Sequence, residues 1–201
     1  MILSRGASRR VGNENPEAMA LFLVLSAYFL VLAALVAANC YVDRLLTPHG
    51  WRWRAAKRLR RRIVKVAFTP ERAIGYLRSV DPFVFEELVL LSFRKAGYRI
   101  RRNRQYTGDG GLDGRMSKDG RRWLLQMKRY SGHIDAADVR AFAGLCREHG
   151  ACGAFVHTGR TGGAAREAVR EAENVFIISG ERLWRLIACG EDVLKNLQQT
   201  K

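Results

Sequence analysis

The stretch GDGGLDGRMSKDGRRWLLQMKRY, residues 108–130, determines the fold expected for the rest of this 201-residue chain. Its glycines indicate a tight loop, which is followed by an expected strand over residues 112–116. The tetrapeptide SKDG, residues 117–120, is typical of a hairpin turn. A return strand is expected over residues 121–128, and its run of large apolar side chains predicts burial on both faces.

Three polar side chains of this hairpin are expected to converge at one end. Gln126 and Lys128 are two residues apart, so in a strand their side chains share one face. Pairing of the two strands brings Asp113 beside them. This set suits magnesium-assisted phosphodiester hydrolysis, because magnesium prefers oxygen ligands and keeps several waters. Lys128 can orient or deprotonate water, or offset charge on the phosphate. The alternative is an ordinary hairpin with surface charges.

Helices and strands alternate on both sides of the hairpin. Upstream, Asp81 followed by Pro82 indicates the start of a helix that ends at Gly97. The other elements are expected as a strand over 98–104, a helix over 134–150, a strand over 151–157, a helix over 161–172, a strand over 175–179 and a helix over 181–188. This order predicts an α/β sandwich around a mixed sheet.

The N-terminal part of the chain has a different character. Residues 1–17 are polar and expected to be disordered. Residues 18–38 carry no charge and are long enough to cross a hydrocarbon core of about 30 Å, so they predict a transmembrane helix. A cleaved signal peptide is the competing interpretation, but here most of the positive charge follows the apolar run. The positive-inside rule then places the C-terminal portion in the cytoplasm of a single-pass inner-membrane protein, with the N-terminus outside.

The charge of the chain predicts a polyanionic partner. Its 35 Lys and Arg residues against 19 Asp and Glu residues give a net charge of +16, which favours nucleic acid or an anionic membrane surface. Within a basic linker over residues 39–68, residues 51–67 predict an amphipathic helix with one apolar stripe. We expect this helix to lie on anionic headgroups, although its cations can instead hold DNA phosphates. A globular domain is expected over 69–189, followed by a tail over 190–201.

Residues 81–187 resemble the Mrr-like restriction endonuclease family, a branch of the PD-(D/E)xK nuclease superfamily. The resemblance rests on motifs that occur in order: Phe85-Glu86, Gly97-Tyr98, GDGGLDG, LLQMKRY, VHTG, GGAAREA and VFIISGERLWRLI. It implies a restriction-endonuclease-like sandwich with a central mixed sheet flanked by helices. In this chain one transmembrane helix precedes that domain.

The resemblance also implies roles for individual residues. Asp113 corresponds to the metal-bridging carboxylate and Lys128 to the catalytic lysine. Gln126 stands where the wider superfamily has Glu or Asp, so its carbonyl oxygen is expected to face the metal. Glu86 corresponds to an acidic residue that completes the metal site, whereas Glu87 is expected to be solvated. The implied ion is Mg²⁺, with Mn²⁺ as a substitute.

DNA is the partner that the resemblance implies. Four side chains are expected to contact its backbone, namely Arg129, Tyr130, Arg102 and Arg104. The implied function is a membrane-anchored DNA endonuclease that restricts modified DNA, as type IV systems do. Two alternatives stay open: a membrane-tethered DNA-binding protein that does not cut, and a nuclease for branched DNA or RNA. Base specificity would come from a homodimer, from another partner, or not at all.

Overall fold

The computed structural model describes residues 16–46, 48–66, 69–102 and 111–199. The chain divides into two compact units, residues 1–50 and residues 51–201. Residues 1–15, which belong to the segment expected to be disordered, lie outside the described residues.

The first unit is dominated by the helix α1, Pro16–Leu46. Within it, Met19–Asn39 is long and apolar enough to cross a membrane, by length and composition, and no other helix in the described part of the chain meets this criterion. Large side chains such as Phe22 and Leu30 are exposed on it. The hydroxyl of Ser26 donates to the carbonyl of Phe22 at 2.7 Å, which satisfies a polar group in an apolar run.

The helix α2, Pro48–Lys65, forms within the expected basic linker. Its apolar stripe of Ala56, Leu59 and Ile63 is buried in the main core of the second unit. The compact unit that contains the sheet thus includes residues upstream of the domain expected over 69–189, and this stripe is not available to insert between headgroups. The sequence pattern could not decide this, because an amphipathic helix fits either a lipid interface or a protein core.

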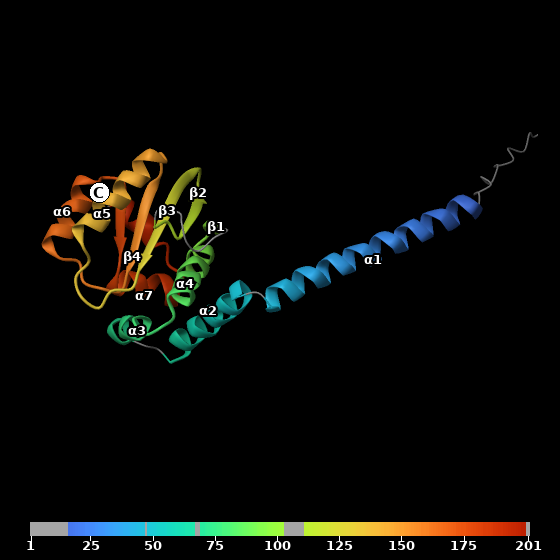
Figure 1. Ribbon diagram of the computed structural model, residues 1–201, viewed down its shortest axis with the longest axis horizontal. Helices are drawn as coiled ribbons and strands as arrows, with labels where there is room; N and C mark the ends of the chain where they lie inside the picture. The colour runs from blue at the N-terminus through green and yellow to red at the C-terminus, as the bar shows by residue number, and fades with distance from the viewer. Residues whose placement is uncertain (1–15, 47, 67–68, 103–110, 200–201) are drawn as a thin grey trace, which may run out of the picture. The chain divides into compact units, whose positions relative to one another are not determined.

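The second unit contains one five-stranded sheet, in the order β1-β2-β3-β4-β5 (Figure 1). The strands are β1 Arg99–Arg102, β2 Gly114–Lys118, β3 Arg121–Lys128, β4 Cys152–His157 and β5 Val175–Ile178. β1, β2 and β3 pair antiparallel, whereas β3, β4 and β5 pair parallel. The expected mixed sheet is therefore confirmed. Asp119 and Gly120 both have positive φ angles and form the predicted turn between β2 and β3.

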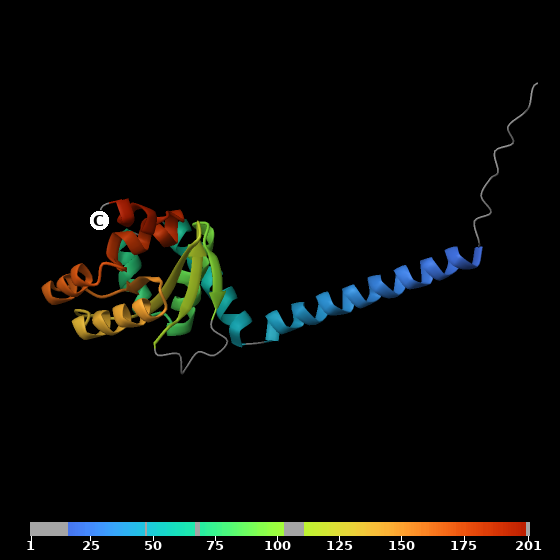
Figure 2. The ribbon, with the colours of Figure 1, turned by 90° about the horizontal axis from the view of Figure 1, so that it is seen from above.

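Helices cover both faces of the sheet, so the expected sandwich is confirmed (Figures 1 and 2). The main core joins one face to α2, α3 Pro70–Leu77, α4 Pro82–Lys95, α7 Gly180–Cys189 and α8 Val193–Gln199. A second core joins the other face to α5 Ala136–Glu148 and α6 Gly163–Glu171. Along β3, Trp123 and Leu125 enter the main core and Leu124 enters the second, which confirms that β3 is buried on both faces.

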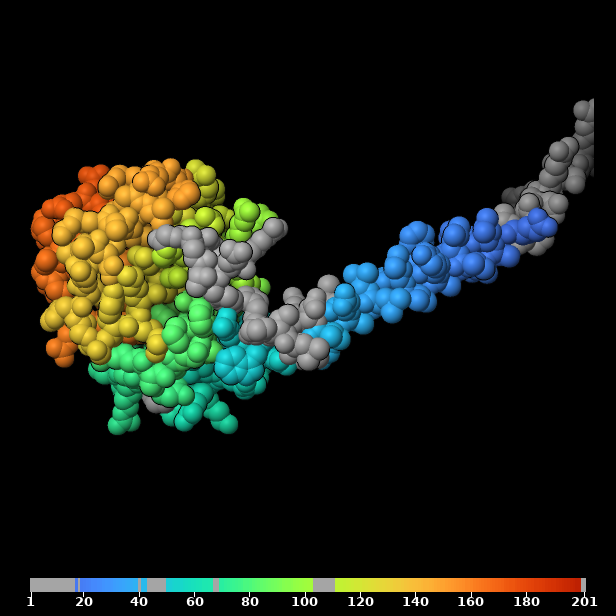
Figure 3. All heavy atoms as spheres, viewed as in Figure 1, coloured from blue at the N-terminus to red at the C-terminus, as the bar shows by residue number. Residues whose placement is uncertain are grey.

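Side chains also fix how α2 and α4 are placed in this unit. The Arg52 guanidinium lies 4.0 Å from the centroid of the Phe83 ring, and Arg60 donates to the Ala188 carbonyl at 3.2 Å. The spheres of α2 adjoin those of α4 in Figure 3. The carboxylate of Asp81 caps α4 by accepting from the Val84 amide at 3.1 Å, as the sequence predicted.

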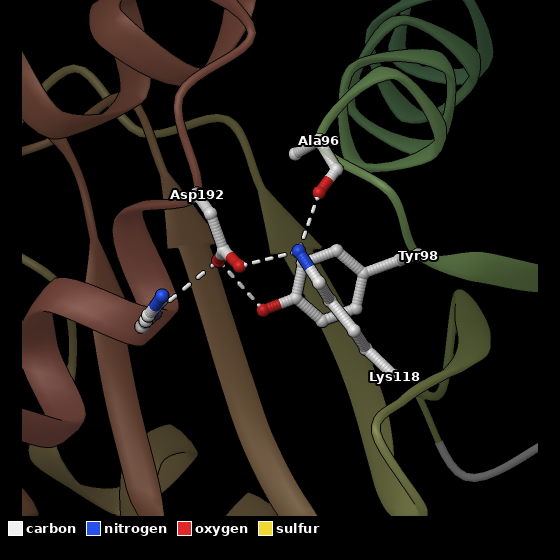
Figure 4. Close-up of polar contacts among 5 residues, drawn as sticks. Ala96, Tyr98, Lys118 and Asp192 are labelled. Carbon is white, nitrogen blue, oxygen red and sulfur yellow. Dashed lines mark hydrogen bonds and ion pairs between the residues drawn. The ribbon is translucent and has the colours of Figure 1, made fainter.

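The expected C-terminal tail is instead partly helical. Val193 and Leu194 of α8 are buried in the main core. Just before α8, the Asp192 carboxylate accepts hydrogen bonds from Lys118 Nζ and the Tyr98 hydroxyl, both at 2.7 Å (Figure 4). These contacts join the C-terminus to β1 and β2. A helix this short has too few residues to show a clear period in the sequence.

Removal of this carboxylate tests its contribution to stability. We expect Asp192→Ala to lower the free energy of unfolding by about 1–3 kcal/mol, because Lys118 and Tyr98 lose a partly buried charged acceptor. Thermal unfolding followed by tryptophan fluorescence measures the change. The control is Glu181→Ala on α7, which removes an exposed pair with Arg185 and should change stability by less than about 1 kcal/mol. Equal effects of the two substitutions would contradict this role for Asp192.

Candidate active site

Asp113 is held at the end of the β2–β3 hairpin by two backbone contacts. Its amide donates to the Leu125 carbonyl at 2.9 Å, and its carboxylate accepts from the Met127 amide at 2.5 Å. Burial raises the pKa of Asp113 to about 6, against the opposing effects of the Met127 amide and the Lys128 ammonium. Asp113 is therefore placed beside β3, as the sequence predicted, with its charged form partly suppressed.

Gln126 presents an acceptor that no described group satisfies. Its side-chain Nε2 donates to the Gly111 carbonyl at 3.0 Å, which sets the orientation of the amide. The other atom, Oε1, is buried without a hydrogen-bond partner. Gly111 has a φ of +84°, and a Cβ atom there would lie 2.7 Å from Nε2. Because a buried acceptor without a partner is costly, Oε1 is suited to meet a cation.

Glu86 reaches the same region from α4. Burial raises its pKa to about 7, and repulsion from Asp113 adds to the shift, whereas Arg52 of α2 opposes it. No group of three or more His, Cys, Asp or Glu side chains gathers anywhere in the described residues. A site of two carboxylates and one amide oxygen nevertheless fits magnesium, which needs few protein ligands.

Lys128 has a partner that the sequence analysis did not identify. Its Nζ lies 2.8 Å from Oδ1 of Asp138 on α5, and the Tyr130 hydroxyl donates to Oδ2 of the same carboxylate. Burial alone would lower the pKa of Lys128, but the hydrogen bond and the charge of Asp138 raise it above its ordinary value. Lys128 is therefore held protonated. Nothing in the spacing of these residues signalled that β3 and α5 would bring them together.

The side chains expected to contact DNA are mostly engaged within the protein. Arg102 forms a two-fold contact with Glu87, with both N–O distances 3.1 Å. Glu87 is buried, which corrects its expected solvation, because α4 turns it toward β1 where Arg102 compensates its charge. Arg129 donates to the carbonyls of Arg78, at 2.9 Å, and of Val80.

Arg104 lies outside the described residues. Tyr130 is committed to Asp138. Contacts of Arg129, Tyr130, Arg102 and Arg104 with DNA therefore stay predictions, and those of the three described side chains would require that they exchange their present partners.

Comparison with known proteins identifies a family for this part of the chain. Residues 77–187, more than half of the chain, match the family Mrr_cat, described as restriction endonuclease. The type IV methyl-directed restriction enzyme EcoKMrr of Escherichia coli strain K12 is 31% identical over 119 residues. That match covers 55% of this chain and 39% of the relative, so the chain spans less than half the length of that protein. All four residues of the candidate site fall within the family match.

The raised pKa of Glu86 generates a test that needs no metal. The folded-state pKa of about 7 exceeds the ordinary value of 4.5, so ionisation of Glu86 destabilises the fold as the pH rises through that interval. We expect Glu86→Gln to stabilise the metal-free protein at pH 8 by about 1–2 kcal/mol, and to have no such effect at pH 4. Thermal unfolding in EDTA measures this difference. Glu167→Gln, on the exposed surface of α6, is the control, and equal stabilisation at both pH values would show that ionisation is not the cause.

Proposed function

Since the chain belongs to the Mrr-type restriction endonuclease family, we propose that it is a membrane-anchored, magnesium-dependent endonuclease that hydrolyses phosphodiester bonds in DNA. The observation that carries the metal site is the buried, unpartnered Oε1 of Gln126 on the strand paired with Asp113. Oxygen atoms of Asp113, Gln126 and Glu86 would hold the ion, and Mn²⁺ would replace Mg²⁺. A bound magnesium ion would supply Lewis-acid activation of the phosphate and of water.

Lys128 acts as a cation in this proposal. Because Asp138 holds its ammonium protonated, Lys128 is suited to offset negative charge on the phosphate and not to remove a proton from water. Asp138 is then a positioning residue, which fixes the ammonium at the end of β3. In the metal-free protein the pKa of Glu86 is about 7, and a bound cation would favour its ionised form.

Modified DNA is the substrate we propose. The similarity to a relative described as a methyl-directed type IV enzyme supports this choice. Concerted cutting of both strands uses two centres, so a homodimer on the DNA belongs to the proposal. Linear product that forms without a nicked-circle intermediate would support it, and accumulation of nicked circles before linear product would reject it. Intact Asp113, Gln126, Lys128 and Glu86 favour this function over a tether that binds DNA without cutting it.

Cleavage of plasmid DNA by the full chain in neutral detergent tests the proposal. We expect nicking or linearisation with Mg²⁺ or Mn²⁺ and none in EDTA, with methylated plasmid preferred. Asp113→Asn and Lys128→Ala should each lower the rate about 100-fold or more, because each removes charge directed at the reacting phosphate. The control is Glu167→Gln, which removes an exposed ion pair with Arg170 on the same helix.

Three results would redirect the proposal. Binding of plasmid without cutting under any metal condition would support the tether. Cutting of four-way junctions or RNA in preference to methylated duplex would support the other nuclease. Cutting that survives both substitutions would place the chemistry elsewhere on the chain.

The membrane anchor is the second part of the proposal. The apolar span Met19–Asn39 is followed by the cations of α2, and by the positive-inside rule the nuclease unit then lies in the cytoplasm. A reporter that works only in the cytoplasm should be active when it is fused after Lys201, and one that works only in the periplasm should be inactive. On fractionation of the cells, the full chain should remain with the membranes. A periplasmic reporter, or complete release into the soluble fraction, would reject this topology.

A further inference from the structure

Four arginines from three neighbouring strands share one face of the sheet. Arg99 and Arg101 lie on β1, Arg115 on β2 and Arg122 on β3. In the strand register Arg101 stands opposite Arg115, while Ser117 stands opposite Arg99 on one side and Arg122 on the other. Alternation along the strands sends the intervening side chains, such as Met116 and Trp123, into the main core. We call Arg99, Arg101, Arg115 and Arg122 the arginine face.

The helices on this side of the sheet cover other strands. α5 packs on β3 and β4, and α6 packs on α5 and β5, whereas β1 and β2 extend beyond them at the edge of the sheet (Figure 1). Arg99, Arg101 and Arg122 are accordingly exposed. A cavity of about 260 Å³ includes all four arginines, Ser117 and His149 in its lining, and none of its described lining residues is acidic.

The arginines on the two faces of β1 have different surroundings. Arg102, on the inner face, is compensated by the buried Glu87 at 3.1 Å. On the outer face, Arg99 and Arg101 are both exposed, and Arg101 stands opposite Arg115. A bound polyanion would interact favourably with this concentration of positive charge. One guanidinium can donate two parallel hydrogen bonds to phosphate oxygens, so four arginines on one face offer donors to several closely spaced phosphates.

We infer that the arginine face binds the phosphate backbone of the DNA that the neighbouring centre cuts. This inference rests on the proposed function for its substrate. Arg115 is two residues from Asp113 along the chain, so the face begins beside the candidate metal site. A duplex presents one charge per about 1.7 Å of its axis, a density that single surface carboxylates do not match. The inference places the DNA contact on the outer face of β1, whereas the Arg102 side chain lies on the inner face.

Binding by the full chain in neutral detergent tests this surface apart from catalysis. The protein carries Asp113→Asn so that DNA is not consumed, and the probe is a fluorescent duplex of about 25 base pairs, titrated at several salt concentrations. We expect the triple variant Arg99→Gln, Arg101→Gln, Arg122→Gln to weaken binding about 10-fold or more. The slope of log K against log salt should become less negative by about 2–3, because each phosphate contact that is removed changes this slope by about 0.9.

The matched control removes the same charge from another basic surface. Arg58→Gln, Arg61→Gln and Lys65→Gln change three exposed cations of α2, and we expect a smaller loss of affinity and of slope than for the triple variant. Substitution of Lys for Arg99, Arg101 and Arg122 should retain the salt slope while lowering affinity, because lysine keeps the charge without the paired geometry. Melting temperatures verify that each variant is folded. If the glutamine variant does not fold, the affinity and salt slope of the lysine variant test the arginine face.

The outcomes separate this inference from the proposed function. Unchanged affinity in the glutamine variant, or a larger loss in the α2 variant, would overturn the arginine face even if plasmid cutting is intact. If the arginines contribute to DNA binding but the unmutated protein never cuts DNA, the arginine face would be supported and the proposed nuclease function rejected.

Discussion

The pairing of β2 with β3 is the constraint on which the candidate site depends. One hydrogen bond crosses from the Asp113 amide to the Leu125 carbonyl, and another returns from the Met127 amide to the Asp113 carboxylate. A slip of one residue would turn every side chain of β3 to the opposite face. Gln126 would then leave Asp113, and Trp123 would leave the main core. The same register therefore fixes both the packing and the chemistry, and burial of β3 on both faces makes any other register costly.

Burial also explains the electrostatics of the site. Asp113 and Glu86 are two carboxylates in a poorly solvated region, and both pKa values are raised. Lys128 lies nearby but is committed to Asp138, so the carboxylates are not neutralised by it alone. A cation bound there, as proposed, would stabilise the folded protein, because it would meet both carboxylates and the unpartnered amide oxygen. The rest of the sheet is stabilised by two apolar cores.

The sequence predicted much of this arrangement because its periodicity is strong. The bounds of β3 agree with the expected strand, and Asp81 and the Asp119-Gly120 turn occupy their expected positions. The errors share a cause, because a pattern along the chain does not show which distant elements will meet. The stripe of α2 packs on protein, and Glu87 is buried with Arg102, which is 15 residues away. Asp138 and Asp192 meet lysines on other elements, and no local pattern encodes such pairs.

The helix α2 has a consequence for any shortened form of this chain. It lies between the apolar span and α3 in the sequence, and its buried stripe of Ala56, Leu59 and Ile63 belongs to the main core. A soluble fragment that begins at residue 69 would expose the apolar side chains that this stripe covers, and it would lose the hydrogen bond from Arg60 to the Ala188 carbonyl. The segment that a sequence reader would remove as a linker is therefore part of what has to be purified with the sheet.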